Sequence, residues 1–249
     1  MRGWTLGSIV LLVGGALGCS IPEKHDTRQE PLYCSGVALP TSADPTVTLS
    51  GAVVEAFSQD PVGGAMVEGH LITPPSTDNP VFTVTADAQG QFSKDQQTLG
   101  VPREAYLRAT ATGYLETRYY PAVPIAHDLE TNVQLLTPAN IATISSLGGI
   151  TIDMTKANLL ITAVDCNENR LAGVTIATEP AGTVLYFANG QPSTTATMTD
   201  AITGTAMIAN APTGLMTITA TINNAAHTQM RGHMFTAAAN VITQSEIQP

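Results

Sequence analysis

Charged and aromatic residues are scarce in this sequence of 249 residues: charged residues make up 12% and aromatic residues 5%. Basic residues are the rarer charge, with 10 Lys and Arg against 20 Asp and Glu, and the formal net charge is −10. Nucleic acids and anionic lipid surfaces require a basic patch on their protein partner, so this balance argues against both as partners. The sequence after residue 20 also lacks any run of about 12 or more residues with helical periodicity, which argues against a helical fold.

Residues typical of strands and turns take the place of helix formers. Thr and Val favour strands, and the 21 Gly and 16 Pro residues punctuate the chain at short intervals. The sequence therefore predicts an all-β protein. Its length allows one large domain or two domains of about 100 residues each.

The first 18 residues have the layout of a secretory signal. Arg2 precedes an apolar run from Thr5 to Leu17, which is too short to span a bilayer as a helix. The run ends in Ala16-Leu17-Gly18-Cys19, which resembles the bacterial lipobox, with Ala16 where lipoproteins usually carry Leu. This resemblance implies cleavage before Cys19 and attachment of lipid to its thiol. The alternative is an ordinary signal peptide with a cysteine that happens to lie near the cleavage site.

Residues 19–45 are predicted to form a flexible tether, because they are rich in Pro and charged residues and have little apolar periodicity. By resemblance to enteric lipoproteins, a residue other than Asp after the lipidated cysteine, here Ser20, favours the outer membrane. One acyl chain anchors a protein only marginally, at about 0.8 kcal/mol for each buried CH₂. The lipoprotein pathway adds a diacylglyceryl group, so the resemblance implies an exported protein held at the bilayer through acylated Cys19.

Two copies of one strand-and-turn pattern are predicted to make up the rest of the chain, at residues 46–138 and 158–249, with a connector at 139–157. The segment Asp87-Ala88-Gln89-Gly90 in the first copy corresponds to Asp200-Ala201-Ile202-Thr203-Gly204 in the second. In both turns the aspartate can accept hydrogen bonds within the turn, and the glycine is suited to a positive φ. Within the connector, residues 140–149 are expected to form one or two helical turns that end at the glycines.

The first copy resembles the carboxypeptidase regulatory-like, or transthyretin-like, β-sandwich. The patterns P-x-x-G-A-x-V, T-x-D-x-x-G-x-F and G-Y are carried by Pro61, Gly64, Ala65, Val67, Thr85, Asp87, Gly90, Phe92, Gly113 and Tyr114. The second copy keeps fewer of these markers, namely Gly173, Val174, Thr199, Asp200 and Gly204. The resemblance implies two tandem antiparallel sandwiches of the seven-stranded type. The markers are turn and core positions, so they imply no chemistry of their own.

Two cysteines remain once Cys19 is assigned to lipid. An exported protein favours a disulfide between Cys34 and Cys166, although each thiol is free in the alternative interpretation. The bridge would close a loop of about 130 residues, for which chain entropy gives at most about 5 kcal/mol of stabilisation. A redox role is not expected, because the sequence has no C-x-x-C motif.

Two groups of residues raise the alternative of a metal site. His127 and Glu130 have the H-x-x-E spacing of the zinc pair in metallocarboxypeptidases, with His227 or His233 as a third candidate ligand. In a strand, however, residues three apart face opposite sides. The histidines and methionines between residues 227 and 234 suggest copper, but strand alternation places the two ligand types on opposite faces. The leading prediction therefore includes no cofactor, and a metal-dependent hydrolase or a copper-handling envelope protein is the alternative.

Tyr119 and Tyr120 are candidates for ligand stacking, since an exposed aromatic ring can stack on a sugar or a peptide. Strand alternation alternatively buries one ring and leaves the other at a rim. No G-x-S-x-G nucleophile motif is present. The sequence thus predicts a non-enzymatic, membrane-anchored lipoprotein of the cell envelope, a binding or structural and adhesion module for an unidentified protein or glycan.

Overall fold

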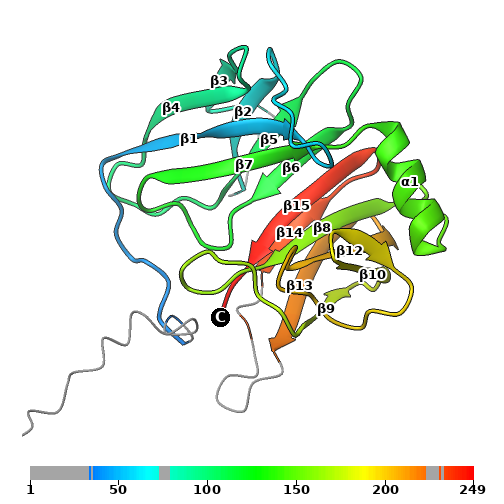
Figure 1. The fold of residues 1–249 in the computed structure, drawn as a ribbon. Coiled ribbons are helices and arrows are strands. Elements are labelled where there is room, and N and C mark those ends of the chain that lie inside the picture. Colours follow the sequence, from blue (N-terminus) through cyan, green and yellow to red (C-terminus); the bar gives the residue numbers. More distant parts are fainter. Residues whose placement is uncertain (1–33, 35, 73–78, 223–229, 231–232) are drawn as a thin grey trace, which may run out of the picture.

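The computed structural model describes residues 34, 36–72, 79–222, 230 and 233–249. This part of the chain forms 15 strands and one helix (Figure 1). The elements of the first half are β1 (Thr46–Glu55), β2 (Met66–Leu71), β3 (Phe82–Thr85), β4 (Gln91–Gln97), β5 (Ala105–Thr110), β6 (Glu116–Tyr120), β7 (Leu129–Leu135) and α1 (Pro138–Gly148). Those of the second half are β8 (Ala157–Ala163), β9 (Val174–Glu179), β10 (Thr183–Ala188), β11 (Gln191–Ser193), β12 (Thr205–Ala211), β13 (Gly214–Ile222), β14 (His233–Ala237) and β15 (Val241–Ile247). The predicted all-β class is confirmed.

The two halves have the same strand arrangement. In the first half, a sheet in the order β4-β1-β7 faces strands in the order β6-β5-β2-β3. In the second half, β12-β8-β15 takes the place of the first sheet and β14-β13-β9 that of the second. The halves differ in their third strand. In the first half β3 pairs with β2, whereas in the second half β10 pairs with β12 and so joins the other sheet.

The halves are joined edge to edge by the last strand of the chain. Strand β15 pairs with β8 on one side and with β6 of the first half on the other. The result is one nine-stranded sheet in the order β11-β10-β12-β8-β15-β6-β5-β2-β3, which runs through both halves (Figure 1). The tandem sandwiches predicted from the sequence therefore share a sheet.

The resemblance implied antiparallel sandwiches, but three of the strand pairs are parallel. The pairs β1–β7, β8–β15 and β6–β15 are parallel. The first two have a common origin, because in each half the first strand lies beside the last and the intervening strands form a crossover. The third arises from the edge-to-edge joining of the halves.

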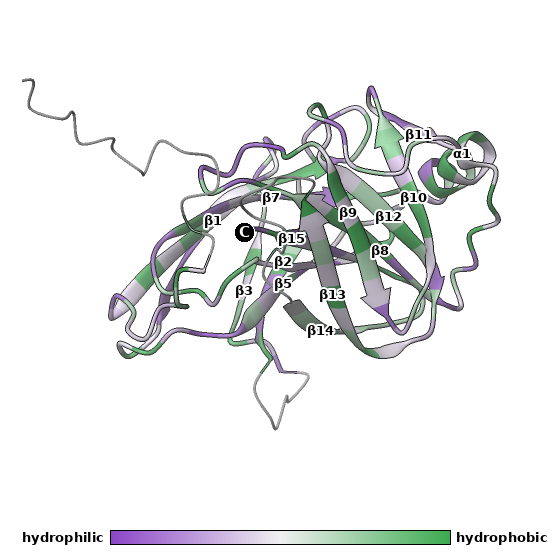
Figure 2. Cartoon of the chain, turned by 90° about the horizontal axis from the view of Figure 1, so that it is seen from below, coloured by the Kyte–Doolittle hydropathy of each residue, from purple (hydrophilic) through white to green (hydrophobic). Residues whose placement is uncertain are grey.

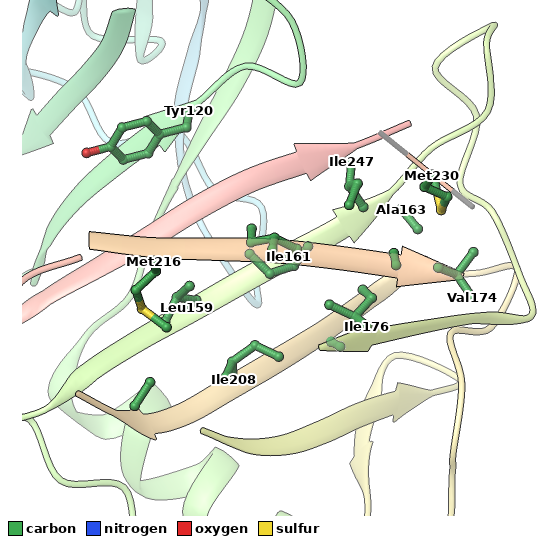
Figure 3. Close-up of a cluster of buried hydrophobic side chains, with 14 of the residues drawn as sticks. Tyr120, Leu159, Ile161, Ala163, Val174, Ile176, Ile208, Met216, Met230 and Ile247 are labelled. Atoms are coloured by element: carbon green, nitrogen blue, oxygen red, sulfur yellow. The ribbon is translucent and has the colours of Figure 1, made fainter. Parts of the chain in front are cut away.

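The nine-stranded sheet is covered on opposite faces in its two halves, which gives the protein three apolar clusters. The first-half cluster lies under β4-β1-β7 and contains Val53, Leu107, Tyr119 and Val133. The second-half cluster lies under β14-β13-β9 and contains Leu159, Ile161, Ile208 and Ile218 (Figure 3). A third cluster lies under α1, on the other face of the second half. Strand β8 is consequently buried at almost every position, and Figure 2 shows the hydrophobic residues spread along such strands.

The turn chemistry predicted for the repeat is present in both halves. Gly90 and Gly204 have φ values of 73° and 60°. Asp87 Oδ1 accepts hydrogen bonds from the backbone N–H groups of Gln89 and Gln91, and Asp200 Oδ1 accepts one from Thr203 N–H. A Cβ atom on Gly90 would lie 2.5 Å from the carbonyl oxygen of Val53, so a side chain is excluded by space as well as by φ.

Helix α1 lies where the sequence predicts helical turns. Thr137 and Asn140 form a capping box at its start, Pro138 occupies the first turn, and Gly149 ends the helix in the left-handed conformation. Its buried residues include Ile141 and Ile144, which pack on the outer face of the second-half sheet. The connector therefore also covers part of the core.

The end of the predicted tether contacts the first half of the protein. Ala43 N–H donates to the Gly100 carbonyl, and Asp44 N–H donates to the Ala126 carbonyl. Farther toward the N-terminus, Cys34 forms a disulfide with Cys166, as the sequence suggested. Cys19 and the proposed signal peptide lie outside the described residues. Within the described chain, no helix has the length and apolar character needed to cross a membrane.

Candidate binding groove between the two halves

A groove runs along strand β7, where the β4-β1-β7 sheet ends above the nine-stranded sheet. Its larger hollow has a volume of about 380 Å³ and a smaller one of about 60 Å³ continues it along β15. Both hollows are lined by Gln134, Leu160, Arg170 and Thr205, so they form one surface, which we call the inter-half groove. Strand β7 forms one wall, and the turns that carry Arg170 and Ile202 form the other.

The wide end of the groove combines apolar and polar side chains. Leu136, Ile144 and Phe187 line it from three different elements. Phe57, in the turn after β1, is 47% exposed, and Ile202, in the turn before β12, is 64% exposed. Large apolar side chains from both halves therefore meet solvent at the same hollow, an arrangement typical of a ligand-binding surface.

The narrow end of the groove is polar and contains a buried carboxyl group. The Tyr119 hydroxyl donates a hydrogen bond to Glu246 Oε2 over 3.1 Å. Burial raises the pKa of the Glu246 carboxyl above its usual value, while this hydrogen bond and the Arg170 guanidinium act in the opposite direction. Arg170 forms no salt bridge with any described residue, so its charge is available to a ligand.

A side chain occupies the edge of β7 in the middle of the groove. Gln244 Oε1 accepts a hydrogen bond from Gln134 N–H over 3.2 Å, and Gln244 Nε2 donates one to the Gln134 carbonyl over 2.5 Å. The Thr117 hydroxyl donates to the same carbonyl. The primary amide of Gln244 thus makes the two hydrogen bonds that the backbone of a neighbouring strand would make.

The two tyrosines predicted to stack on a ligand are both buried, with exposures of 4% for Tyr119 and 2% for Tyr120. Their rings lie on opposite faces of β6, Tyr119 in the first-half cluster and Tyr120 in the second-half cluster. Neither ring forms a rim, because β6 lies in the interior of the nine-stranded sheet and is covered on both sides. The expected exposed stacking surface is therefore absent at these two residues.

The candidate metal ligands do not form a cluster in the described part of the chain. His127 Nδ1 lies 2.8 Å from Asp44 Oδ2, and this ion pair is exposed. No group of three His, Cys, Asp or Glu residues suited to a metal is present among the described residues. His227 lies outside these residues, and the side chain of His233 is not described. Met230 is buried and Met234 is exposed, so the two methionines have different environments.

A second polar cluster lies on the opposite face of the first half. The Arg108 Nε atom lies 3.0 Å from Glu68 Oε2, and the Arg118 guanidinium contacts Glu116 at 2.9 Å and the face of the Tyr106 ring at 5.7 Å. The buried His70 ring stacks on Tyr106, and burial lowers its pKa. These groups neutralise one another, so we interpret the cluster as structural.

The sequence did not identify Arg170, Gln134, Gln244 or Glu246 as site residues. The terminal strand carried the one usable signal, because strand alternation places Gln244 and Glu246 on the same face. The residues facing them come from β7 and from the turn after β8, which a periodicity argument does not bring together.

No protein-family model matches this chain, and no curated protein matches it. Among solved structures, the chain is similar to the Bacillus anthracis TIE protein at 14% identity and a TM-score of 0.29, over 82% of this chain and 34% of that one. It therefore spans about a third of the length of that protein. It is also similar to the shaft pilin SpaA from Lactobacillus rhamnosus GG at 13% identity and a TM-score of 0.25, over 84% and 98% of the two chains. For 3-chlorocatechol 1,2-dioxygenase from Rhodococcus opacus 1CP, the values are 12% and 0.28, over 40% and 64%.

Proposed function

We propose that this protein is a lipid-anchored, non-enzymatic binding module of the bacterial cell envelope, and that the inter-half groove is its binding site. The observation that carries the proposal is the groove itself, where side chains from both halves line one hollow of about 380 Å³. They include the exposed Phe57 and Ile202, and Arg170, which forms no salt bridge within the described part of the chain. A volume of this size is within the usual range of ligand sites, about 300 to 1,000 Å³. The partner is a protein or a glycan of the envelope.

The repeated sandwich supports a binding or adhesion role over catalysis. The markers of the carboxypeptidase regulatory-like resemblance, such as Asp87 and Gly90, form turns, and Phe92 is buried in the core. A fold of this kind hosts function on its surface, so the site has to be inferred from the groove. We infer the family membership from these residues and the shared strand arrangement of the halves.

The alternative of a metal-dependent hydrolase or a copper-handling protein is tested by metal content. We expect the purified chain to carry less than about 0.1 equivalent of zinc or copper, because His127 is paired with Asp44 instead of with other candidate ligands. Elemental analysis of the wild type and of His227→Ala measures this directly. Stoichiometric metal that is lost in His227→Ala would instead support the metal-dependent alternative.

The anchor is supported by the Leu17-Gly18-Cys19 sequence and by the position of the disulfide. Cys34 is attached to the folded domain, which leaves residues 20–33 as the spacer between lipid and protein. A fully extended spacer of this length reaches about 50 Å. The groove would consequently be held close to the membrane surface.

Replacement of the lipidated cysteine tests the anchor. We expect wild-type protein to incorporate labelled palmitate and to sediment with membranes, and Cys19→Ser to lose both properties, because no other anchor is proposed. Cys34→Ser is the matched control, since it removes a cysteine but leaves Cys19, and it should remain labelled. If Cys19→Ser retains the label and the membrane association, the lipoprotein assignment is wrong.

A further inference from the structure

Strand β7 has one edge that faces away from its sheet. It pairs in parallel with β1, and Ala56 N–H donates to the Leu135 carbonyl over 3.0 Å. In a parallel pair, alternate residues direct both backbone groups to the same side. Since Leu135 faces β1, the backbone groups of Glu130, Asn132 and Gln134 point away from β1, and Asn132 and Gln134 line the groove.

Part of this edge is already paired and part is not. At Gln134 the amide of Gln244 takes the place of a strand, and at Leu136 the carbonyl accepts a hydrogen bond from Leu115 N–H. The outward N–H and C=O groups of Glu130 and Asn132 make no hydrogen bond with any described residue, and both residues are exposed. Two successive outward positions therefore present free donors and acceptors, the arrangement to which an added strand binds.

The surface beside this edge can receive an added strand. The smaller hollow lies against Asn132 and Gln134, and its floor is formed by Thr162 of β8 and by Gln244 and Glu246 of β15. A strand beside β7 would extend β4-β1-β7 to four strands and lie over the part of the shared sheet that α1 leaves uncovered. The side chains of such a strand would alternate between this floor and solvent.

The charge around the edge favours a basic occupant. Glu130 lies on this edge, and the smaller hollow beside it contains Glu246 and Arg170. A further hollow at the start of β7 contains Asp128 and Glu168, so carboxyl groups outnumber the Arg170 guanidinium around the edge. His127 is already paired with Asp44, and the whole chain has a formal net charge of −10. A Lys or Arg side chain on the occupant would therefore meet a complementary surface.

We propose that an extended, basic segment of a partner protein binds by adding a strand to β7, through backbone hydrogen bonds with Glu130 and Asn132. The proposal rests on the proposed binding function and specifies its ligand class. Affinity comes from the main-chain hydrogen bonds and selectivity from basic side chains near Glu130 and Glu246. The amide of Gln244 marks the end of the added strand.

The test is a titration of the full-length protein with a synthetic peptide of alternating Lys, Val and Thr. Asn132→Pro removes the outward N–H and leaves the backbone bonds to β1 in place, since proline is tolerated at a sheet edge. We expect Asn132→Pro to weaken binding at least tenfold. Asn132→Ala should bind within about twofold of the wild type, because it loses the side chain and its bond to Ala52 N–H but keeps the outward N–H. Ser93→Pro, at the outer edge of β4 on the other side of the same sheet, is the second control and should also bind normally.

Three altered peptides keep the test independent of protein folding. A peptide N-methylated at alternate residues, so that one edge loses its donors, should not bind, whereas the peptide methylated on the opposite edge should bind. A peptide with Glu in place of Lys should bind at least tenfold more weakly. Equal binding of all peptides, equal binding to Asn132→Pro and wild type, or no binding at about 1 mM would overturn strand addition. A partner that still crosslinks to the groove in Asn132→Pro would leave the proposed function intact while excluding this mode of binding.

Discussion

Replacement of both Cys34 and Cys166 by serine is expected to lower the free energy of unfolding by about 4 to 5 kcal/mol. The disulfide joins residues separated by 132 positions, so its removal releases a loop that contains the whole first half and strand β8 from a constraint on the unfolded state. The turn that contains Cys166 is fixed by hydrogen bonds, because Asp165 Oδ1 accepts from the backbone N–H groups of Asn167 and Asn169. The bridge is therefore expected to stabilise the fold without distortion of the β8–β9 turn.

Urea denaturation followed by far-ultraviolet circular dichroism measures this effect. The protein with the disulfide and the double serine variant are compared in a Cys19→Ser background, so that no unpaired thiol can exchange with the bridge. In the presence of a reductant, the protein with both cysteines should unfold at the same urea concentration as the double serine variant. A loss below about 1 kcal/mol would show that the bridge does not constrain the unfolded chain as the entropy model requires.

Tyr120→Ala is expected to lower the free energy of unfolding by about 3 to 5 kcal/mol, the usual range for truncation of a buried aromatic residue. Tyr120 belongs to β6 of the first half but is part of the second-half cluster (Figure 3). Its ring lies 4.8 Å from that of Phe235. Its hydroxyl donates a hydrogen bond to the Thr236 carbonyl over 3.2 Å. The substitution therefore opens a cavity at the junction of the halves and should destabilise both.

Hydrogen exchange during urea titration tests whether the halves unfold together. Protection of β2 and of β13 should be lost at the same urea concentration in the wild type and at a lower, still common concentration in Tyr120→Ala. Tyr120→Phe is the control, because it keeps the ring and removes the hydroxyl with its hydrogen bond to the Thr236 carbonyl, at a cost of about 1 kcal/mol for that bond. Separate loss of protection in the two strands would contradict a shared cooperative core.

The local features of this protein could be predicted from its sequence, because local chemistry determines them. The Asp87–Gly90 and Asp200–Gly204 turns have the expected aspartate hydrogen bonds and positive φ values. The helix of the connector ends at Gly149 as the glycines indicated. The pairing of Cys34 with Cys166 followed from a count of the available thiols.

The joining of the halves could not be predicted in the same way. Alternation shows which residues of β6 share a face, but it does not show that β15 pairs with its free edge. For that reason one of Tyr119 and Tyr120 was expected at a rim, whereas a covered sheet buries both. The switch of β10 to β12 and the groove beside β7 also depend on contacts between segments far apart in the sequence.

The groove is the part of the molecule on which the functional account depends. Its wide end combines exposed apolar groups with Arg170, and its narrow end combines the free edge of β7 with the buried Glu246 carboxyl. Both ends are formed by residues from the two halves, so the shared sheet fixes their geometry. Loss of the junction at Tyr120 should accordingly disturb binding as well as stability.

Photocrosslinking from within the groove in cells that carry the anchored protein tests the central claim most directly. A benzophenone amino acid at position 57, in place of a phenylalanine that is 47% exposed, faces the wide end of the groove. The same amino acid at position 215, where Leu215 on β13 is 65% exposed and lines none of the groove, is the matched control. The account predicts a discrete crosslinked product from position 57 and none from position 215. The same products from both positions, or no product from position 57, would contradict it.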